Sequence, residues 1–269
     1  MTIPMRWALR RRMMMAALGS GIDVAALSIT YTGAYTDYGM VTMSDGARYR
    51  LLAFTSSGTL SIEQPVNCEV CVVGGGANGA NGRGGGGVGG AGAYLKKQSV
   101  SAYNGGSVVV GAGQGISSIG GVSVAAVSGK NGGTGAGGKT GGTGDGLSKY
   151  PFEDTGYSLW AGKPHCGGGG QGDYKWRHSV QDRYTNGFKG GDGGTNGGNG
   201  YPGESNQISN PPGGVGGSYG GGEGGSGKAK YYGSGAGGGR YYENVGDVTL
   251  YNGASGYQGI VYMRIPVNQ

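Results

Sequence analysis

The sequence is poor in the side chains that build an ordinary hydrophobic core. Leu, Ile, Val and Phe together account for 42 of the 269 residues, which is below the fifth of a chain that folded domains normally use. Charged residues are also scarce, at 13%, whereas 70 residues are glycine and 8 are proline. Glycine and proline at this level are typical of low-complexity sequence. A large conventional core is therefore excluded.

Plain disorder is not expected either. Disordered chains are rich in charge and poor in aromatic residues, but this chain has 19 tyrosines and a net charge of only +6. Something other than the burial of large side chains must therefore offset the conformational entropy that each glycine loses on ordering.

Cysteine and histidine are rare. Three cysteines form no disulfide framework, and free thiols fit assembly in a reducing cytoplasm. Cys68 and Cys71 have the spacing of a zinc or redox pair, but positions i and i+3 of a strand face opposite sides of the sheet. His165, Cys166 and His178 offer no second pair of matching spacing. We therefore expect apolar cysteines in a sheet and no metal.

A nucleotide cofactor is not expected. Residues 74–79 read Gly-Gly-Gly-Ala-Asn-Gly and satisfy G-x-G-x-x-G after a strand. A dinucleotide site then needs a helix and an acidic residue roughly 20 positions further on. Residues 80–92 are mostly glycine, and the residues around Leu95 to Lys97 include no Asp or Glu.

Catalytic residues are equally hard to assemble. Catalysis needs a nucleophile–base or acid–base set with supporting groups, and the chain has only two histidines. A polysaccharide depolymerase could use two carboxylates, but nothing positions a particular pair. The candidates in loop-like sequence are Glu153, Asp154, Asp173 and Asp182. We predict that the protein is not an enzyme.

The N-terminus combines Arg10 to Arg12 with a six-residue apolar run, 13–18. This run is shorter than the roughly 7 to 15 residues of a signal-peptide core, and no run in the chain is long enough to span a membrane. We expect a short amphipathic helix over about 5–18, within an attachment segment 1–20; a cleaved signal peptide is the alternative.

Nucleic-acid binding is not expected, because only Arg83 begins an Arg-Gly-Gly triplet.

The chain changes character near Gly74, because residues 1–73 contain 6 glycines and residues 74–146 contain 29. The fold class predicted is mainly β, with a short N-terminal helix and a small sheet or sandwich into which glycine tracts are inserted. The domains expected are the attachment segment 1–20, a short-stranded β region 21–66, and a glycine-rich domain 67–269.

Val, Ile and Tyr favour strands, and the C-terminal strand would complete a sheet begun early. The strands expected are 26–32, 38–43, 48–54, 59–63, 69–73, 93–97, 107–110, 122–127, 247–251 and 259–265, with Asp45-Gly46 and Ser56-Ser57-Gly58 as hairpin loops.

The glycine tracts have two interpretations. Gly/Ser-rich sequence is often a flexible linker, whereas polyproline II geometry, with three residues per turn, places its backbone groups for bonds to neighbouring segments. Glycines recur every third residue over 129–144, 191–203 and 76–85. We therefore favour packed polyglycine II helices.

Aromatic residues concentrate in the region 147–212, interleaved with Gly, Ser, Asn and Asp. Rigid aromatics among such residues are typical of recognition loops; the alternative is that they pack on the glycine layers. We predict loops with exposed Trp anchors. The candidate receptor-binding residues are Tyr150, Phe152, Tyr157, Trp160, Tyr174, Trp176, Tyr184 and Phe188, with Tyr201 at the end of the stretch.

Four segments resemble a glycine-rich domain common in bacteriophage tail proteins. They are residues 50–60, 69–76, 107–113 and 255–266, and the resemblance covers roughly 47–128 and 253–267. It implies a scaffold on a virion, assembled in the host cytoplasm, and some members are adhesins with layered polyglycine II helices. The function expected is a non-enzymatic tail fibre or tail-tip adhesin. Its partners would be other virion proteins through the N-terminal region and a host cell-surface protein or polysaccharide. The alternative is a purely structural virion or cell-surface protein.

Overall fold

The computed structural model describes residues 21–80, 90, 92–124, 150–161, 165–166, 174–178, 181–185, 231–236, 241–244, 247–250 and 252–267. The fold is mainly β, as predicted, and the described residues contain no α-helix. One sheet has eight strands, all paired antiparallel, in the order β2–β3–β12–β4–β5–β6–β7 with β1 beside β4. Its strands are β1 (Ile29–Tyr31), β2 (Tyr35–Thr42), β3 (Arg48–Phe54), β4 (Gly58–Val73), β5 (Leu95–Val109), β6 (Ser117–Ile119), β7 (Val122–Val124) and β12 (Ile260–Pro266).

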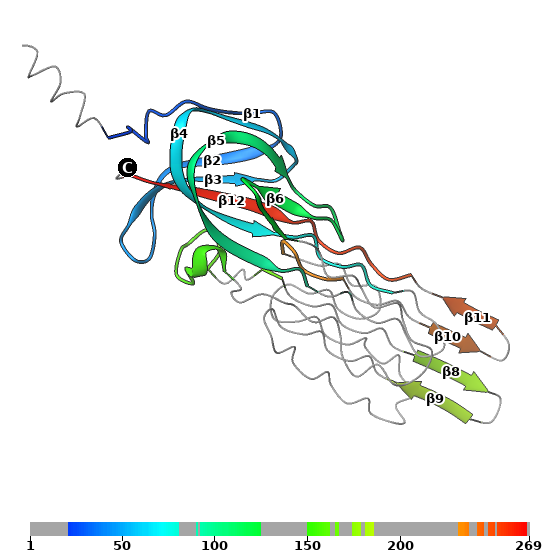
Figure 1. Ribbon diagram of the computed structural model, residues 1–269. Helices are drawn as coiled ribbons and strands as arrows, with labels where there is room; N and C mark the ends of the chain where they lie inside the picture. The colour runs from blue at the N-terminus through cyan, green and yellow to red at the C-terminus, as the bar shows by residue number, and fades with distance from the viewer. Residues whose placement is uncertain are drawn as a thin grey trace, which may run out of the picture.

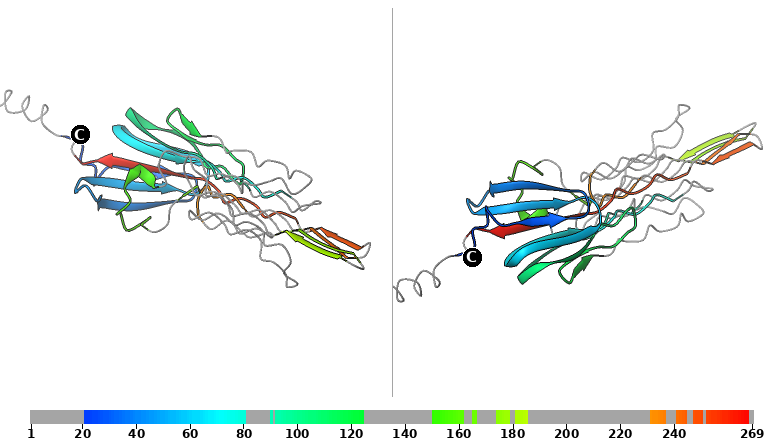
Figure 2. Two further views of the ribbon diagram at one scale, coloured as in Figure 1. Left: turned by 90° about the horizontal axis from the view of Figure 1, so that it is seen from below. Right: turned by 90° about the horizontal axis from the view of Figure 1, so that it is seen from above.

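This sheet folds over into two layers (Figure 2). The long strands β4 and β5 curve strongly, so that they face β2, β3 and β12 across an interior (Figure 1). Residues 59–63 and 66–68 of β4 alternate between buried and exposed, as a strand with one solvated face does. Its last four residues, 70–73, are all buried, because this half of the strand is covered on both faces. We call the two layers the sandwich.

The interior of the sandwich is a cluster of aliphatic side chains with a few aromatic residues. Leu52 and Phe54 of β3 and Met263 of β12 are fully buried in it. The expected return of the chain is confirmed, because β12 pairs with both β3 and β4. The four segments that carry the phage resemblance contribute to β3, β4, β5 and β12, which are consecutive neighbours in the sheet.

The two expected hairpin loops have different outcomes. β2 and β3 pair directly across Asp45-Gly46, and Gly46 has φ of +81°, as such a tight turn requires. Residues 56–58 do not form a hairpin, because β12 lies between β3 and β4. The expected domain boundary between residues 66 and 67 falls inside β4, so both predicted segments share one sheet.

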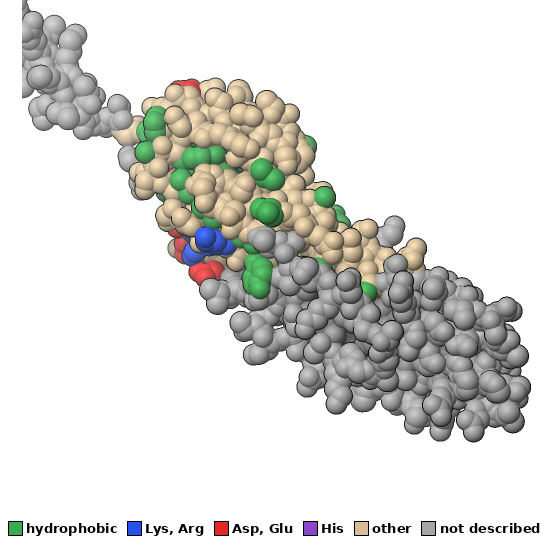
Figure 3. Space-filling view, turned by 45° about the vertical axis from the view of Figure 1, so that its right-hand side comes forward, with side chains coloured by type: hydrophobic (Ala, Val, Ile, Leu, Met, Phe, Trp, Pro, Cys, Tyr) green, Lys and Arg blue, Asp and Glu red, His purple; other side chains and the backbone are tan. Residues whose placement is uncertain are grey.

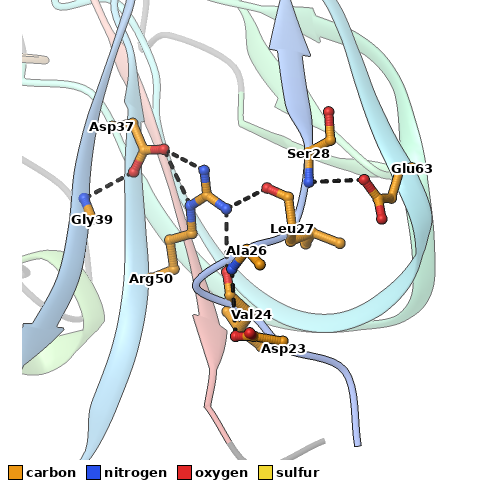
Figure 4. Close-up of polar contacts among 9 residues, drawn as sticks. All are labelled: Asp23, Val24, Ala26, Leu27, Ser28, Asp37, Gly39, Arg50 and Glu63. Atoms are coloured by element: carbon orange, nitrogen blue, oxygen red, sulfur yellow. Dashed lines mark hydrogen bonds and ion pairs between the residues drawn. The ribbon is translucent and has the colours of Figure 1, made fainter. Parts of the chain in front are cut away.

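Arg50 fixes the segment 21–28 against the sandwich (Figure 4). Its Nε and Nη2 donate to one carboxylate oxygen of Asp37, at 3.1 and 2.7 Å. Its Nη1 donates to the backbone carbonyl oxygens of Val24 and Leu27. One guanidinium therefore connects β2, β3 and the segment 21–28.

A second sheet has four strands in the order β11–β10–β8–β9. Its strands are β8 (Tyr174–His178), β9 (Gln181–Thr185), β10 (Tyr241–Asn244) and β11 (Asp247–Leu250). The hairpins β8–β9 and β10–β11 are joined through a parallel pairing of β8 with β10. This second sheet, which we call the tip sheet, lies at the opposite end of the described chain from residue 21 and the end of β12 (Figure 1).

Three predictions concern residues outside the described ranges: the helix over 5–18, the tracts 129–146 and 190–203, and the candidates Phe188 and Tyr201. Within the described part of the chain, no helix has the length and apolar character needed to cross a membrane.

Candidate functional site

The first part of the predicted aromatic region packs against the sandwich. Residues 150–161, which contain the short 3-10 helix η1 (Pro151–Glu153), cover the outer face of β3, β12 and β4. Trp160 is 1% exposed and Phe152 is 4% exposed. The Trp160 ring makes an edge contact with Tyr157, at a centroid distance of 4.8 Å, and another with Tyr262 of β12, at 5.4 Å. We call 150–161 the covering segment.

The expectation that Trp160 is an exposed anchor is therefore wrong. The central strands carry apolar residues on both faces, and Trp160 and Phe152 supply the apolar cover that the outer face requires. Phe152 also contacts a buried cation, since the Arg264 guanidinium lies 4.5 Å from its ring centroid. Tyr150 and Tyr157 are partly buried and pack against the same cluster.

Asp154 holds the covering segment in place. One carboxylate oxygen accepts hydrogen bonds from the backbone amides of Gly156 and Tyr157, both at 3.1 Å, and the other accepts from the amide of Ser44, at 2.9 Å. Burial opposes ionisation of this carboxyl, but the hydrogen bonds from the Ser44 hydroxyl and these amides prevail and lower its pKa. The carboxylate is thus occupied by structural hydrogen bonds.

Glu153 lies beside Asp154 at a depression of about 340 Å³. The depression is lined by Ser44, Asp45, residues 152–155 and Arg264. Glu153 pairs with Lys97 at 2.8 Å, and Arg264 pairs with Glu69 of β4. Glu153 and Arg264 thus each have an ion-pair partner of opposite charge.

The second part of the predicted aromatic region lies in the tip sheet. Tyr174 and Trp176 belong to β8 and Tyr184 to β9. The expectation of loops is wrong here, because residues 174–178 and 181–185 are strands joined by a two-residue connection. The sequence did contain a signal for a strand, because Tyr174 and Trp176 are aromatic residues at alternate positions, and such residues favour strands. The structure thus separates the predicted site residues between the sandwich and the tip sheet.

Between these two places, extended glycine-containing segments bond to one another through their backbones. The Gly76 amide donates to the Tyr257 carbonyl oxygen at 2.8 Å, and the Gly79 amide donates to the Ala254 carbonyl oxygen at 2.9 Å. Donors and acceptors both advance by three residues, in opposite directions along the chain. A sheet ladder would advance by two, so these antiparallel segments repeat with a different period. We call residues 74–80, 111–115, 231–236 and 252–259 the glycine bundle.

Segment 74–80 bonds to neighbours on several sides. The Gly75 amide donates to the Gly115 carbonyl oxygen at 2.9 Å, and the Ala77 carbonyl oxygen accepts from the Ala236 amide at 3.0 Å. Together with the partners at 254 and 257, this gives one segment three different neighbours. A strand in a sheet has two, in one plane.

Close approach of these backbones requires glycine at every third position. A Cβ atom built on any of three consecutive register positions before β12 would overlap a backbone carbonyl oxygen of the facing segment. The overlapping pairs are Gly253 with Gly79, Gly256 with Gly76 and Gly259 with Val73.

The same bundle accounts for the glycine motif at 74–79. The amides of Gly75, Gly76 and Gly79 donate to backbone carbonyl oxygens and are not turned towards a common anion, as a phosphate-binding loop requires. Residues 74–80 are extended and contain no helix.

The cysteine pair follows the expected geometry. Cys68 lies in the interior cluster and Cys71 in the cluster on the outer face, so the two side chains lie on opposite faces of β4. Burial raises the pKa of each thiol to about 12, and it also raises the pKa of the buried Cys166 thiol. The described residues contain no group of three or more His, Cys, Asp or Glu side chains able to hold a metal ion.

On the face of the described residues that Figure 3 shows, charged side chains are few. On the face shown in Figure 3, most of the coloured Lys, Arg, Asp and Glu side chains gather in one group, and the rest of the described surface is largely uncharged.

Comparisons of the chain with known proteins found no match: no family model, no curated protein and no solved structure is similar to it.

Proposed function

We propose that this chain is a non-enzymatic bacteriophage virion protein, an adhesin of the tail fibre or tail tip that presents a recognition surface on a glycine-rich scaffold. The observation that carries the proposal is the position of the tip sheet, at the far end of the described chain from residue 21 and the end of β12 (Figure 1). A surface that must reach a host envelope has to lie far from the end that attaches to the particle. Two strands from the predicted aromatic region, 174–178 and 181–185, lie at this distal end.

The scaffold in this proposal consists of polyglycine II helices, including the tracts 129–146 and 190–203. Its support is the glycine bundle, in which backbone hydrogen bonds advance in steps of three residues and a Cβ would overlap facing carbonyl oxygens. Both properties follow from three-residue extended helices packed side by side. Such a scaffold is rigid without a large apolar core, which suits the composition of the chain.

Attachment to the particle is assigned to the opposite end. We place the contact with another virion protein in residues 1–20, as a short helix. The support is the Arg50 contact with Val24 and Leu27, which holds the first described residues against the sandwich (Figure 4). The host partner is a cell-surface protein or polysaccharide.

A matched pair of tryptophan variants tests the recognition function. A Trp anchor contributes about 2 kcal/mol or more to an interface, so Trp176→Ala in β8 should weaken host-cell binding about thirtyfold and leave the melting temperature nearly unchanged. Trp160→Ala should lower the melting temperature and leave adsorption per folded molecule unchanged, because Trp160 is buried against the sandwich. Binding of the purified protein to host cells and thermal unfolding are measured on both variants. Normal adsorption by Trp176→Ala would refute the assignment of Trp176 as an anchor.

A purely structural virion or cell-surface protein is the second candidate. The burial of Trp160 and Phe152 favours it, because these two members of the predicted recognition set serve packing. This candidate predicts no saturable binding of the intact protein to host cells. It also predicts that variants in the tip sheet alter assembly rather than adsorption.

A further inference from the structure

Four tyrosines from separate parts of the chain lie near the buried Tyr262 of β12, which contacts the Trp160 and His165 rings. Tyr38 comes from β2, Tyr157 from the covering segment, and Tyr232 and Tyr257 from the glycine bundle; we call these four the tyrosine cluster. The rings of Tyr232 and Tyr257 make an edge contact with centroids 5.5 Å apart. Burial raises the pKa of Tyr157 and of Tyr232, and the Tyr38 phenol contributes to both shifts, as expected if Tyr38 lies close to both.

A buried layer of aromatic rings supports this cluster from below. His165 and Tyr262 are 3% and 4% exposed, and the His165 Nε2 lies 3.1 Å from the Tyr262 hydroxyl. The His165 ring contacts Tyr232 at a centroid distance of 5.7 Å, and the Trp160 ring contacts Tyr157 at 4.8 Å. Tyr157 and Tyr232 are therefore held before any ligand arrives, which reduces the entropic cost of binding.

The cluster is accessible and carries almost no charge. Tyr38 is 40% exposed and Tyr257 is 38% exposed, while Tyr157 and Tyr232 are half-buried. Asp154 is the one charged side chain among the groups that shift these phenols, and its carboxylate accepts hydrogen bonds from backbone amides. Among the described residues, no other charged side chain acts on Tyr157 or Tyr232, which favours a neutral ligand.

We propose that the tyrosine cluster is a binding surface for a neutral saccharide, on the side of the sandwich and separate from the tip sheet. A sugar ring has an apolar C–H face and a rim of hydroxyls, which fits aromatic rings that carry hydroxyl groups. Binding sites of this kind combine aromatic walls with a few placed polar groups. A protein partner would instead be expected to use a buried Arg or aromatic anchor in a fully desolvated pocket, and these rings form the rim of an open surface.

Titration of the full-length protein with maltohexaose, cellohexaose and a neutral galacto-oligosaccharide tests the proposal. The readouts are calorimetry and tryptophan fluorescence, because the Trp160 ring makes an edge contact with Tyr157. We expect saturable binding of at least one sugar, weakened about fivefold or more by Tyr38→Ala and by Tyr257→Ala, a loss equivalent to about 1 kcal/mol. Tyr38→Phe, which keeps the ring, should retain most of the affinity.

Two controls make the result decisive. Tyr94 is 41% exposed and lies outside the cluster, so Tyr94→Ala should leave binding unchanged. Trp176→Ala should also leave sugar binding unchanged, which separates this surface from the tip sheet and from the proposed host-cell recognition. The proposal is overturned if no sugar binds at about 10 mM, well above the range of weak specific sites. It is also overturned if binding survives Tyr38→Ala and Tyr257→Ala, or if Tyr94→Ala weakens binding equally.

Discussion

The sandwich and the glycine bundle are ordered by different means, although they are continuous in the chain. In the sandwich, side chains at alternate positions of β3, β4 and β12 fill an interior and an outer cluster. In the glycine bundle, backbone segments pack directly against one another, and carbonyl oxygens of one segment occupy the space that a Cβ of the next would need. β4 passes directly from the first arrangement to the second at Val73 and Gly74.

This difference shows how a chain with few aliphatic residues can still be ordered. The aliphatic residues concentrate in one sandwich, where burial contributes roughly 25 cal/mol per Å² of apolar area. The bundle relies on backbone hydrogen bonds, each of which contributes only about 1 kcal/mol net. It therefore needs many bonds and close packing, and few of its positions should tolerate a side chain.

The largest effect is expected where the bundle is most crowded. A Cβ at Gly76 would overlap the backbone carbonyl of Ser234, and a backbone atom cannot move aside as a flexible side chain can. Gly76→Val should therefore prevent cooperative folding of the bundle, a cost above the usual overpacking penalty of about 1–3 kcal/mol. Circular dichroism and thermal unfolding measure it. Gly113→Ala is the matched control, because its Cβ would lie 3.0 Å from the Gly256 carbonyl oxygen and needs only a small shift.

In the sandwich, the largest loss should follow removal of the buried tryptophan. Trp160→Ala should cost about 3–5 kcal/mol of unfolding free energy, the range for large core aromatics. Ile116→Ala, at a residue that is 57% exposed, should change stability by less than about 0.5 kcal/mol. Urea unfolding compares the two variants. A similar small loss in both would mean that the covering segment contributes little to the sandwich.

A smaller, pH-dependent effect is expected at Asp154. Its pKa is lowered from 3.8 in the folded state, so its stabilising contribution is present above that pH and disappears as the pH falls through the folded-state pKa. Asp154→Asn should cost about 1 kcal/mol at pH 7, as the loss of a capping side chain does. The difference from the unmodified protein should shrink as the pH falls below 3.8. A difference that is constant with pH would show that the charge of Asp154 plays no part.

The smallest expected effect is a gain in the free energy of unfolding rather than a loss. The Tyr103 hydroxyl is buried and has no hydrogen-bond partner among the residues that the structure describes, and burial raises its pKa to about 12. An unsatisfied buried polar group costs about 1–3 kcal/mol. Tyr103→Phe should therefore leave stability unchanged or raise it by about 1 kcal/mol. A clear destabilisation in urea would mean that the hydroxyl has a favourable interaction.

Sequence patterns predicted the strands that have a strong β composition. The predicted strand 48–54 coincides with β3, and the apolar C-terminal strand returns to the sheet as expected. The pairing order was not accessible in the same way. Residues 56–58 resemble a hairpin loop, yet β12 lies between the two flanking strands. The sequence around 56–58 could not predict this, because it holds no signal for a strand about 200 residues further on.

The candidate site was predicted only in part, for a related reason. Composition identified the aromatic region, but it could not tell a buried ring from an exposed one. Trp160 is buried because the outer face of the sandwich is apolar, a property that appears only once the strands are paired. The tyrosine cluster could not be predicted from the sequence either, because its members come from three distant stretches of the chain: Tyr38, Tyr157, and Tyr232 with Tyr257.

Residue-resolved hydrogen exchange of the glycine bundle tests the central claim most directly, namely that backbone hydrogen bonds order this part of the chain. The amides of Gly75, Gly76 and Gly79 all donate to backbone carbonyl oxygens of other segments. We predict that they exchange as slowly as the amides of β4, within about tenfold, because they open only with the surrounding structure. Exchange of these three amides at the rate of an unstructured peptide, while β4 stays protected, would contradict the account.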